Sequence, residues 1–242
     1  MAEFESIRST TRSDSNINID SGLRAHMNKV YGLMAVAMVI TGLVAWSIGT
    51  SPQLVGALFS NSIISLIVMF APLGFVFFLS ARVMKMSYSA GQLSFWLFSA
   101  LMGLSLSTIF VVYTGASIAN AFFTTAVAFG AMSLFGYTTK KDLSGMGRFL
   151  FMGVIGLIVA MIINWFTQSP GLEFAINVLG VLIFAGLTAY DTQNIKNTYL
   201  SIRNAPNGEE IAAKAGILGA LSLYINFLNM FMFLLQFMGN RE

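Results

Sequence analysis

The sequence predicts an all-α membrane protein with seven transmembrane helices, and three observations lead to that fold class. Of its 242 residues, 56% are apolar and only 10% are charged, whereas soluble domains carry about a quarter charged residues. The mean hydropathy is +0.76. The chain also contains seven apolar stretches of roughly the 17 to 25 residues that a helix needs to cross about 30 Å of hydrocarbon. We expect helices because an open sheet in lipid would leave backbone groups unpaired.

The seven expected spans follow one another along the chain, separated by short breaks with turn signals. Ahead of them, residues 1–25 are polar and lack the apolar run of a signal peptide, so we expect a disordered cytoplasmic tail there and a transmembrane domain over residues 26–242. The expected spans are residues 27–49, 62–81, 91–113, 118–138, 149–167, 173–195 and 213–238.

The positions of lysine and arginine predict the orientation in the membrane. If the tail is cytoplasmic, 12 of the 13 basic residues lie on the cytoplasmic side, and only Arg241 lies outside. By the positive-inside rule, residue 1 is then expected in the cytoplasm and residue 242 outside. The 12 residues are Arg8, Arg12, Arg24, Lys29, Arg82, Lys85, Lys140, Lys141, Arg148, Lys196, Arg203 and Lys214.

Composition and motifs argue against enzyme chemistry. The chain has no cysteine, which excludes disulfides and thiol catalysis. Its single histidine, His26, rules out a histidine-based metal cluster and is expected at the membrane interface, beside the polar tail. Phosphate-binding, zinc-protease and dinucleotide motifs are absent, and Lys214, at the mouth of the last span, is not placed to bind retinal. We expect no enzyme, cofactor, metal centre or nucleic-acid partner.

Polar and small side chains inside the spans recur at steps of three and four, which places them on one helix face. Small residues allow close packing, and amides hydrogen-bond across helices for about 0.6 to 2 kcal/mol each. The stripe of the last span covers nearly its whole length, which predicts either a helix enclosed by others or one that lines a polar path. The stripes are Gly219, Ser222, Asn226, Asn229, Phe233 and Gln236 in the last span, Gly153, Gly156, Ala160, Asn164 and Thr167 in the fifth, and Asn177, Gly180, Phe184, Thr188 and Asp191 in the sixth.

Asp191 is the only acid inside an apolar span. A carboxylate at mid-membrane costs about 2.5 to 3.5 kcal/mol on insertion scales, and such residues are functional by default. The alternative is a solvated residue at the end of the sixth helix. In a last helical turn, however, a carboxylate meets the negative end of the helix dipole. Either the helix continues through "NIKNTY", or a cation and amide donors compensate the charge.

The segments "FAGLTAYDTQNIK" and "GALSLYINFLNMFMFLLQFMGNR" resemble the signature of the Bax inhibitor-one family, also called the transmembrane Bax-inhibitor-motif family. "SGMGRFLFMGVIG", "YTGASIA" and "FFLSARVMKMS" resemble its bacterial members. The resemblance implies seven helices with the last enclosed by the other six. It also implies a pH-sensitive calcium leak pathway in a bacterial inner membrane. Some bacterial members bind and restrain an ATP-dependent membrane protease.

The resemblance also suggests site residues. The family's pH sensor is a pair of aspartates, of which the first corresponds to Asp191, whereas the second position holds Asn226. We therefore expect a leak pathway for calcium or another cation, gated around Asp191, with weakened pH sensing. Arg82 is expected to supply the positive charge that pairs with Asp191. The alternative is a regulatory protein that restrains a membrane protease. Residues expected to line the path or to make helix contacts are Ser222, Asn229, Thr188, Asn164 and Asn177.

Overall fold

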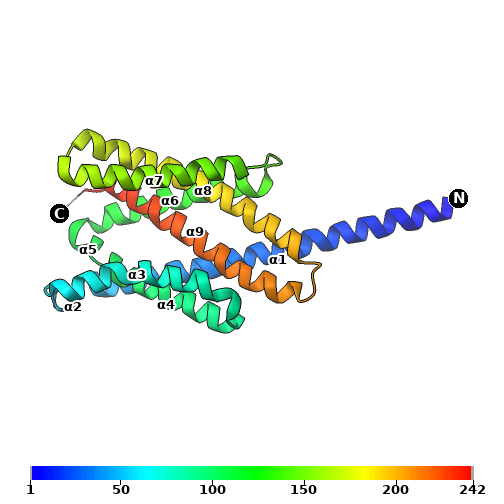
Figure 1. Cartoon of the computed structure of the whole chain (residues 1–242), viewed down its shortest axis with the longest axis horizontal. Coiled ribbons are helices and arrows are strands. Elements are labelled where there is room, and N and C mark those ends of the chain that lie inside the picture. The colour runs from blue at the N-terminus through cyan, green and yellow to red at the C-terminus, as the bar shows by residue number, and fades with distance from the viewer. Residues whose placement is uncertain (1, 241–242) are drawn as a thin grey trace.

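The structure is a computed structural model that describes the backbone of residues 2–240 and the side chains of residues 21–240. The predicted disordered tail, residues 1–25, consists mainly of residues whose side chains the structure does not describe, so its disorder stays a prediction. The helices, shown in Figure 1, are α1 (Ala2–Gly49), α2 (Pro52–Phe59), α3 (Ser62–Arg82), the 3-10 turn η1 (Val83–Lys85), α4 (Tyr88–Leu106), α5 (Ile109–Val112), α6 (Gly115–Thr138), α7 (Ser144–Thr167), α8 (Pro170–Ile202) and α9 (Gly208–Met238).

Among the residues that the structure describes, seven helical segments are long and apolar enough to cross a membrane, which confirms the predicted fold class. They are α1 from Ser21 onward, α3 with η1, α4 with α5, α6, α7, α8 and α9. Neither α2 nor α5 was predicted as a separate helix. A turn at Ser107 and Thr108 separates α4 from α5, and there the hydroxyl of Ser107 donates to the carbonyl of Leu104 at 2.7 Å.

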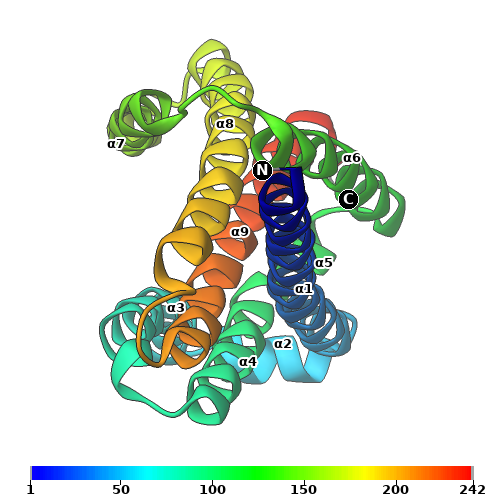
Figure 2. The ribbon, with the colours of Figure 1, turned by 90° about the vertical axis from the view of Figure 1, so that its right-hand side faces the viewer.

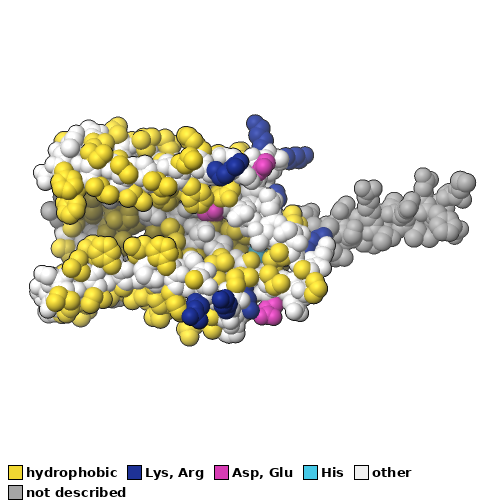
Figure 3. Space-filling model, viewed as in Figure 1, with side chains coloured by type: hydrophobic (Ala, Val, Ile, Leu, Met, Phe, Trp, Pro, Cys, Tyr) yellow, Lys and Arg dark blue, Asp and Glu magenta, His cyan; other side chains and the backbone are white. Residues whose placement is uncertain are grey.

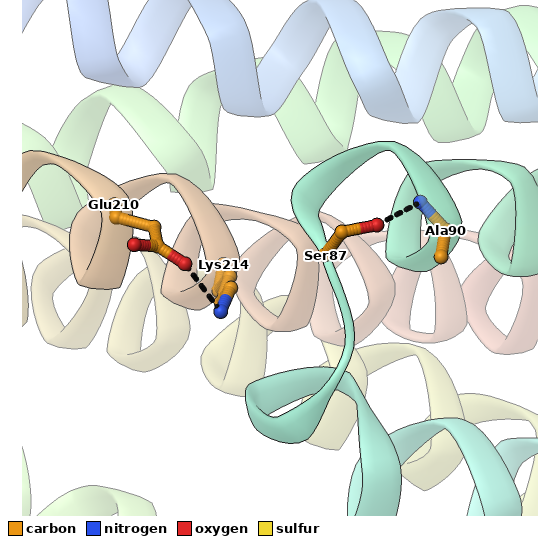
Figure 4. A network of polar contacts seen from close by, with 4 residues as sticks. All are labelled: Ser87, Ala90, Glu210 and Lys214. Atoms are coloured by element: carbon orange, nitrogen blue, oxygen red, sulfur yellow. Dashed lines mark hydrogen bonds and ion pairs between the residues drawn. The ribbon is translucent and has the colours of Figure 1, made fainter.

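Capping side chains explain where several helices begin. A side-chain oxygen at the position before a helix accepts a backbone N–H that has no partner within the helix. Asn61 does so for α3, accepting from Ile63 N at 2.9 Å. Ser87 does so for α4, accepting from Ala90 N at 3.3 Å (Figure 4). Nearby, Lys214 and Glu210 form an ion pair of 2.7 Å within the first turns of α9 (Figure 4).

The last helix, α9, lies inside the bundle. It packs against α8, α1, α6 and α4, and it runs between them in Figure 2. In the most apolar stretch of α9, 67% of the residues are buried, whereas in the corresponding stretch of α7 only 6% are buried. These values confirm the prediction that the last helix is enclosed, and they leave α7 as a peripheral helix that faces lipid.

A buried polar contact ties α9 to α1 and α4. The hydroxyl of Tyr224, whose side chain is fully buried, lies 2.6 Å from Oγ1 of Thr41. That same Oγ1 donates to the carbonyl of Ser99 at 2.9 Å. The ring of Tyr224 packs edge-on against Phe95 and Phe98, with centroids 5.8 and 5.7 Å away. The contact holds α9 in register with two neighbours on the side away from α8.

The outer surface of the bundle is apolar along its length and basic at one end. Figure 3 shows hydrophobic side chains over most of the helices, with lysine and arginine gathered toward the end where α1 begins. We call this the basic end and the other the far end, where α9 finishes (Figure 1). All lysines and arginines among the described side chains lie toward this end, within α1, near the ends of other helices or in loops: Arg24, Lys29, Arg82, Lys85, Lys140, Lys141, Arg148, Lys196, Arg203 and Lys214.

Candidate functional site

Asp191 lies within α8, which continues through the segment "NIKNTY" to Ile202. The carboxylate is therefore not in a last helical turn, where the helix dipole would oppose it. Asn226 on α9 supplies a donor: its Nδ2 lies 2.7 Å from Oδ2 of Asp191. Asn226 itself is 5% exposed. The sequence left open two ways to accommodate the charge: a helix that continues past Asp191, or a cation with amide donors. The helix does continue, and an amide donor is present.

The neighbours of Asp191 in the sequence connect α8 to α7 and to the loop before it. The ring of Tyr190 packs against Phe151 of α7, with centroids 6.1 Å apart. The side chain of Gln193 makes two hydrogen bonds with the backbone of the segment between α6 and α7. Its Oε1 accepts from Leu143 N, and its Nε2 donates to the carbonyl of Lys141, each at 2.8 Å.

Thr192 connects the same segment to α6 and, through it, to α1. Its Oγ1 lies 3.1 Å from the hydroxyl of Ser133 on α6, and Ser133 in turn hydrogen-bonds Tyr31 on α1. The four consecutive residues 190–193 thus contact α7, α9, α6 and the loop between α6 and α7. A movement of α8 at Asp191 would change contacts with all of these elements.

Two cavities meet at Asp191. The smaller, of 190 Å³, lies toward the basic end between α1, α8 and α9, and we call it the basic-end cavity. The larger, of 380 Å³, lies between α7, α8 and α9, and we call it the middle cavity. Asp191 and Ser222 line both cavities. The hydrogen bond between Asp191 and Asn226 therefore lies at the boundary between the two cavities.

A third cavity continues the series toward the far end. This far cavity, of 320 Å³, shares Met161 with the middle cavity. Its lining includes Asn164 and the almost fully buried Asn177, whose Oδ1 has no hydrogen-bond partner among the described residues. Gln236, the last polar residue of the α9 stripe, lies there too. The stripe thus lines a row of cavities while the other faces of α9 are enclosed.

The remaining predicted lining residues divide into two groups. Ser222 and Asn229 line the middle cavity, and Asn229 also donates from Nδ2 to the carbonyl of Ile225 at 2.8 Å. Thr188 is fully buried and donates to the carbonyl of Phe184 at 2.8 Å, so it serves helix packing and lines none of the three cavities.

The predicted pairing of Arg82 with Asp191 is not formed in this structure. Arg82 ends α3 with its side chain exposed, and it makes no ion pair with Asp191. The reason is the packing of the helices: α3 lies against α4, whereas α8 lies against α9, α7 and α6.

The small-residue stripe of the fifth span is only partly used for packing, because Gly156 of α7 is exposed and has open space around it.

The structure adds one residue, His26, to the surroundings of Asp191. His26 was expected at the membrane interface; its side chain is 9% exposed, and its ring stacks on that of Tyr199, with centroids 4.6 Å apart. His26 lines the basic-end cavity together with Asp191. No local pattern signals this contact, because its partner lies on α8, far along the chain. Among the described residues no group of three or more His, Cys, Asp or Glu side chains is placed to hold a metal ion.

Comparison with known proteins covers nearly the whole chain. A family model described as "Inhibitor of apoptosis-promoting Bax1" matches residues 23–242. The chain is 46% identical over 233 residues to the "Inner membrane protein YbhL" of Escherichia coli, which covers 96% of this chain and 98% of that protein. It is 44% identical over 244 residues to a protein of Caulobacter vibrioides, with 97% and 96% covered. A protein of Rickettsia prowazekii, RP147, is 40% identical over 235 residues, with 97% and 98% covered.

Proposed function

Because the chain belongs to the Bax inhibitor-one family and its helices are built to span a membrane, we propose that it is a cation leak channel of the bacterial inner membrane. Calcium is the proposed ion. The observation that carries the proposal is the row of three cavities along α8 and α9, in which each cavity shares at least one lining residue with the next.

The chemistry of the row suits a cation that passes through without binding tightly. Asp191 supplies one carboxylate, and side-chain oxygens of Ser222, Asn229 and Asn177 are spaced along the row. Calcium takes six to eight oxygen ligands, so one carboxylate with scattered neutral oxygens and water gives weak sites. Conduction requires such weak sites in series, because an ion must leave each of them.

Asp191 and Asn226 are the proposed gate. Their hydrogen bond of 2.7 Å joins α8 to α9 where the basic-end cavity meets the middle cavity. Opening requires these two helices to separate, which breaks the bond. A side-chain amide does not titrate and donates to a carboxylate at any ordinary pH. We therefore propose a channel whose opening depends less on pH than that of a site with two carboxylates.

The proposed orientation places the basic end in the cytoplasm. Lysine and arginine are enriched in the cytoplasmic loops of membrane proteins, and the described basic side chains share one end of this bundle. The chain then begins in the cytoplasm and ends outside. Reporter fusions at the two ends test this: activity on opposite sides is expected, whereas activity on one side would contradict it.

Calcium influx into liposomes tests the proposed function. Purified protein is incorporated into vesicles that contain a calcium-sensitive dye, with empty vesicles as the control. Influx well above that of empty vesicles is expected, and Asp191→Asn is expected to change its rate. If neither protein conducts, the channel proposal fails. The regulatory alternative is then examined by asking whether a membrane protease co-purifies with the chain and is inhibited by it.

A further inference from the structure

A long groove runs along the bundle between α1 and α6, away from the row of cavities. Two cavities form it, one of 680 Å³ toward the basic end and one of 810 Å³ beyond it, and Tyr31 and Phe129 line both. Both helices pack against α8 and α9, and they lie on the same side of α9 (Figure 2). Phe227 of α9 lines the inner part of the groove. We call this the α1–α6 groove.

The groove is cationic and polar at the basic end. Arg24, Asn28 and Tyr137 line that part, and the Arg24 side chain is exposed. A second positive charge lies close by, because Nζ of Lys196 donates to the carbonyl of Tyr137 at 2.8 Å. No acid is found among the described residues that line either cavity. This end of the groove is therefore complementary to an anion.

Beyond Tyr31 the groove is apolar. Gly42 and Gly115 leave it open, because a Cβ at either of them would have no neighbour within 4 Å. From Tyr137 to Phe122 the α6 backbone rises roughly 22 Å at about 1.5 Å per residue. That is about half of the 40 to 45 Å thickness of a bilayer, so it matches one leaflet. The apolar lining includes Met34, Met38, Leu43, Phe110, Ile118 and Phe123.

We propose that the α1–α6 groove binds one anionic phospholipid of the leaflet at the basic end. Its phosphate lies against Arg24 and Asn28, and an acyl chain follows α6 past Phe129 into the apolar part. Three features favour this occupant over another protein helix: the groove changes from cationic to apolar along one lipid length, it faces the bilayer, and basic pockets between transmembrane helices are known to hold anionic headgroups.

The proposed lipid would touch the contacts that lead to Asp191. Tyr31, which lines both parts of the groove, hydrogen-bonds Ser133, and Ser133 lies 3.1 Å from Oγ1 of Thr192. Thr192 follows Asp191 directly in α8. An occupied groove fixes the spacing of α1 and α6 and thereby supports this chain of hydrogen bonds. The binding itself does not depend on whether the protein conducts ions.

Native mass spectrometry of the full chain tests the site. The protein is released from micelles that contain equal amounts of phosphatidylglycerol and phosphatidylcholine, and the bound lipids are counted. One phosphatidylglycerol is expected to remain on the unaltered protein. Arg24→Gln should weaken its retention about fivefold, the effect of removing one cation near a lipid headgroup. The matched control is Arg82→Gln, which removes an exposed arginine from the same end but outside the groove, and should have no effect.

A second pair of variants tests whether the lipid needs the open space of the groove. Gly130→Phe fills open space between α1 and α6 and should abolish retention of the lipid. Gly156→Phe places the same side chain at an exposed glycine of α7 that also has open space around it, and should leave retention unchanged. Equal retention of the two lipids, or equal losses for test and control variants, would show non-specific lipid only and overturn the proposal. If Gly130→Phe fails to fold, the comparison of the two arginine variants decides.

Discussion

The side-chain amide of Asn226 on α9 donates a hydrogen bond of 2.7 Å to the carboxylate of Asp191 on α8. Asn226 is nearly buried, and the bond lies where two cavities meet. One contact between two helices thus gives the acid a hydrogen-bond donor at the boundary between two cavities. The following predictions depend on this contact and on the packing around it.

Removing the amide should destabilise the fold. Asn226→Leu leaves Asp191 without its donor, and leaving a buried polar group unpaired costs about 1 to 3 kcal/mol. We expect a loss of that size in the free energy of unfolding, measured by denaturation in detergent. Asn229→Leu is the control, because its amide donates to the carbonyl of Ile225 within its own helix, and it should cost less. Equal losses would mean that the bond to Asp191 adds nothing specific.

Restoring a second carboxylate should steepen the pH response. In Asn226→Asp, two carboxylates lie at hydrogen-bond distance and share a proton, so their titration is coupled. Calcium influx into liposomes should then vary severalfold between about pH 6 and about pH 8, while the unaltered protein shows a flatter profile. An unchanged profile in Asn226→Asp would show that this contact does not control the flux.

Arg82 and Asp191 should act independently. The exposed side chain of Arg82 makes no ion pair with Asp191. Residues without shared partners usually have additive effects within about 0.3 to 0.5 kcal/mol. A double-mutant cycle with Arg82→Gln and Asp191→Asn, measured as the free energy of unfolding in detergent, should therefore give a coupling energy near zero. A coupling of several kcal/mol would indicate that the two side chains pair in another state of the protein.

The contact between α6 and α8 should not tolerate a methyl group at Gly136. A Cβ there would lie 2.1 Å from the carbonyl oxygen of Ala189, two residues before Asp191. Overpacking of this kind typically costs about 1 to 3 kcal/mol, so Gly136→Ala should lower the free energy of unfolding by that amount. Gly130→Ala, on the same helix with open space around it, should cost nothing, because alanine favours the helix more than glycine does. Similar losses for both would contradict the close approach.

The sequence was sufficient to predict the seven spans and the inward face of α8. Apolar length alone determines which segments cross a bilayer, and the spacing from Asn177 to Asp191 places the polar residues on one side. Asn177, Thr188 and their neighbours Gly180 and Phe184 are indeed buried. The contact of Asp191 with Asn226 followed from the family resemblance, since the two lie on different helices and no local pattern joins them.

Other features could not be predicted because they depend on how the helices pack. Arg82 has the charge to compensate Asp191, but α3 packs against α4 and not against α8. His26 stacks on Tyr199 because α1 passes the basic-end cavity, and neither residue carries a sequence signal for the other. The α1–α6 groove likewise arises from a spacing between two helices that periodicity does not encode.

The most direct test of the central claim is chemical modification of the middle cavity. The natural chain has no cysteine, so Asn229→Cys places a single thiol in that cavity, and a positively charged thiol reagent is added while calcium influx into liposomes is recorded. Gln53→Cys, an exposed position on α2 outside the three cavities, is the control. We predict that modification of Asn229→Cys lowers influx to the level of empty liposomes and that modification of Gln53→Cys leaves it unchanged. Complete modification of Asn229→Cys with undiminished influx would contradict the claim that cations pass along α8 and α9.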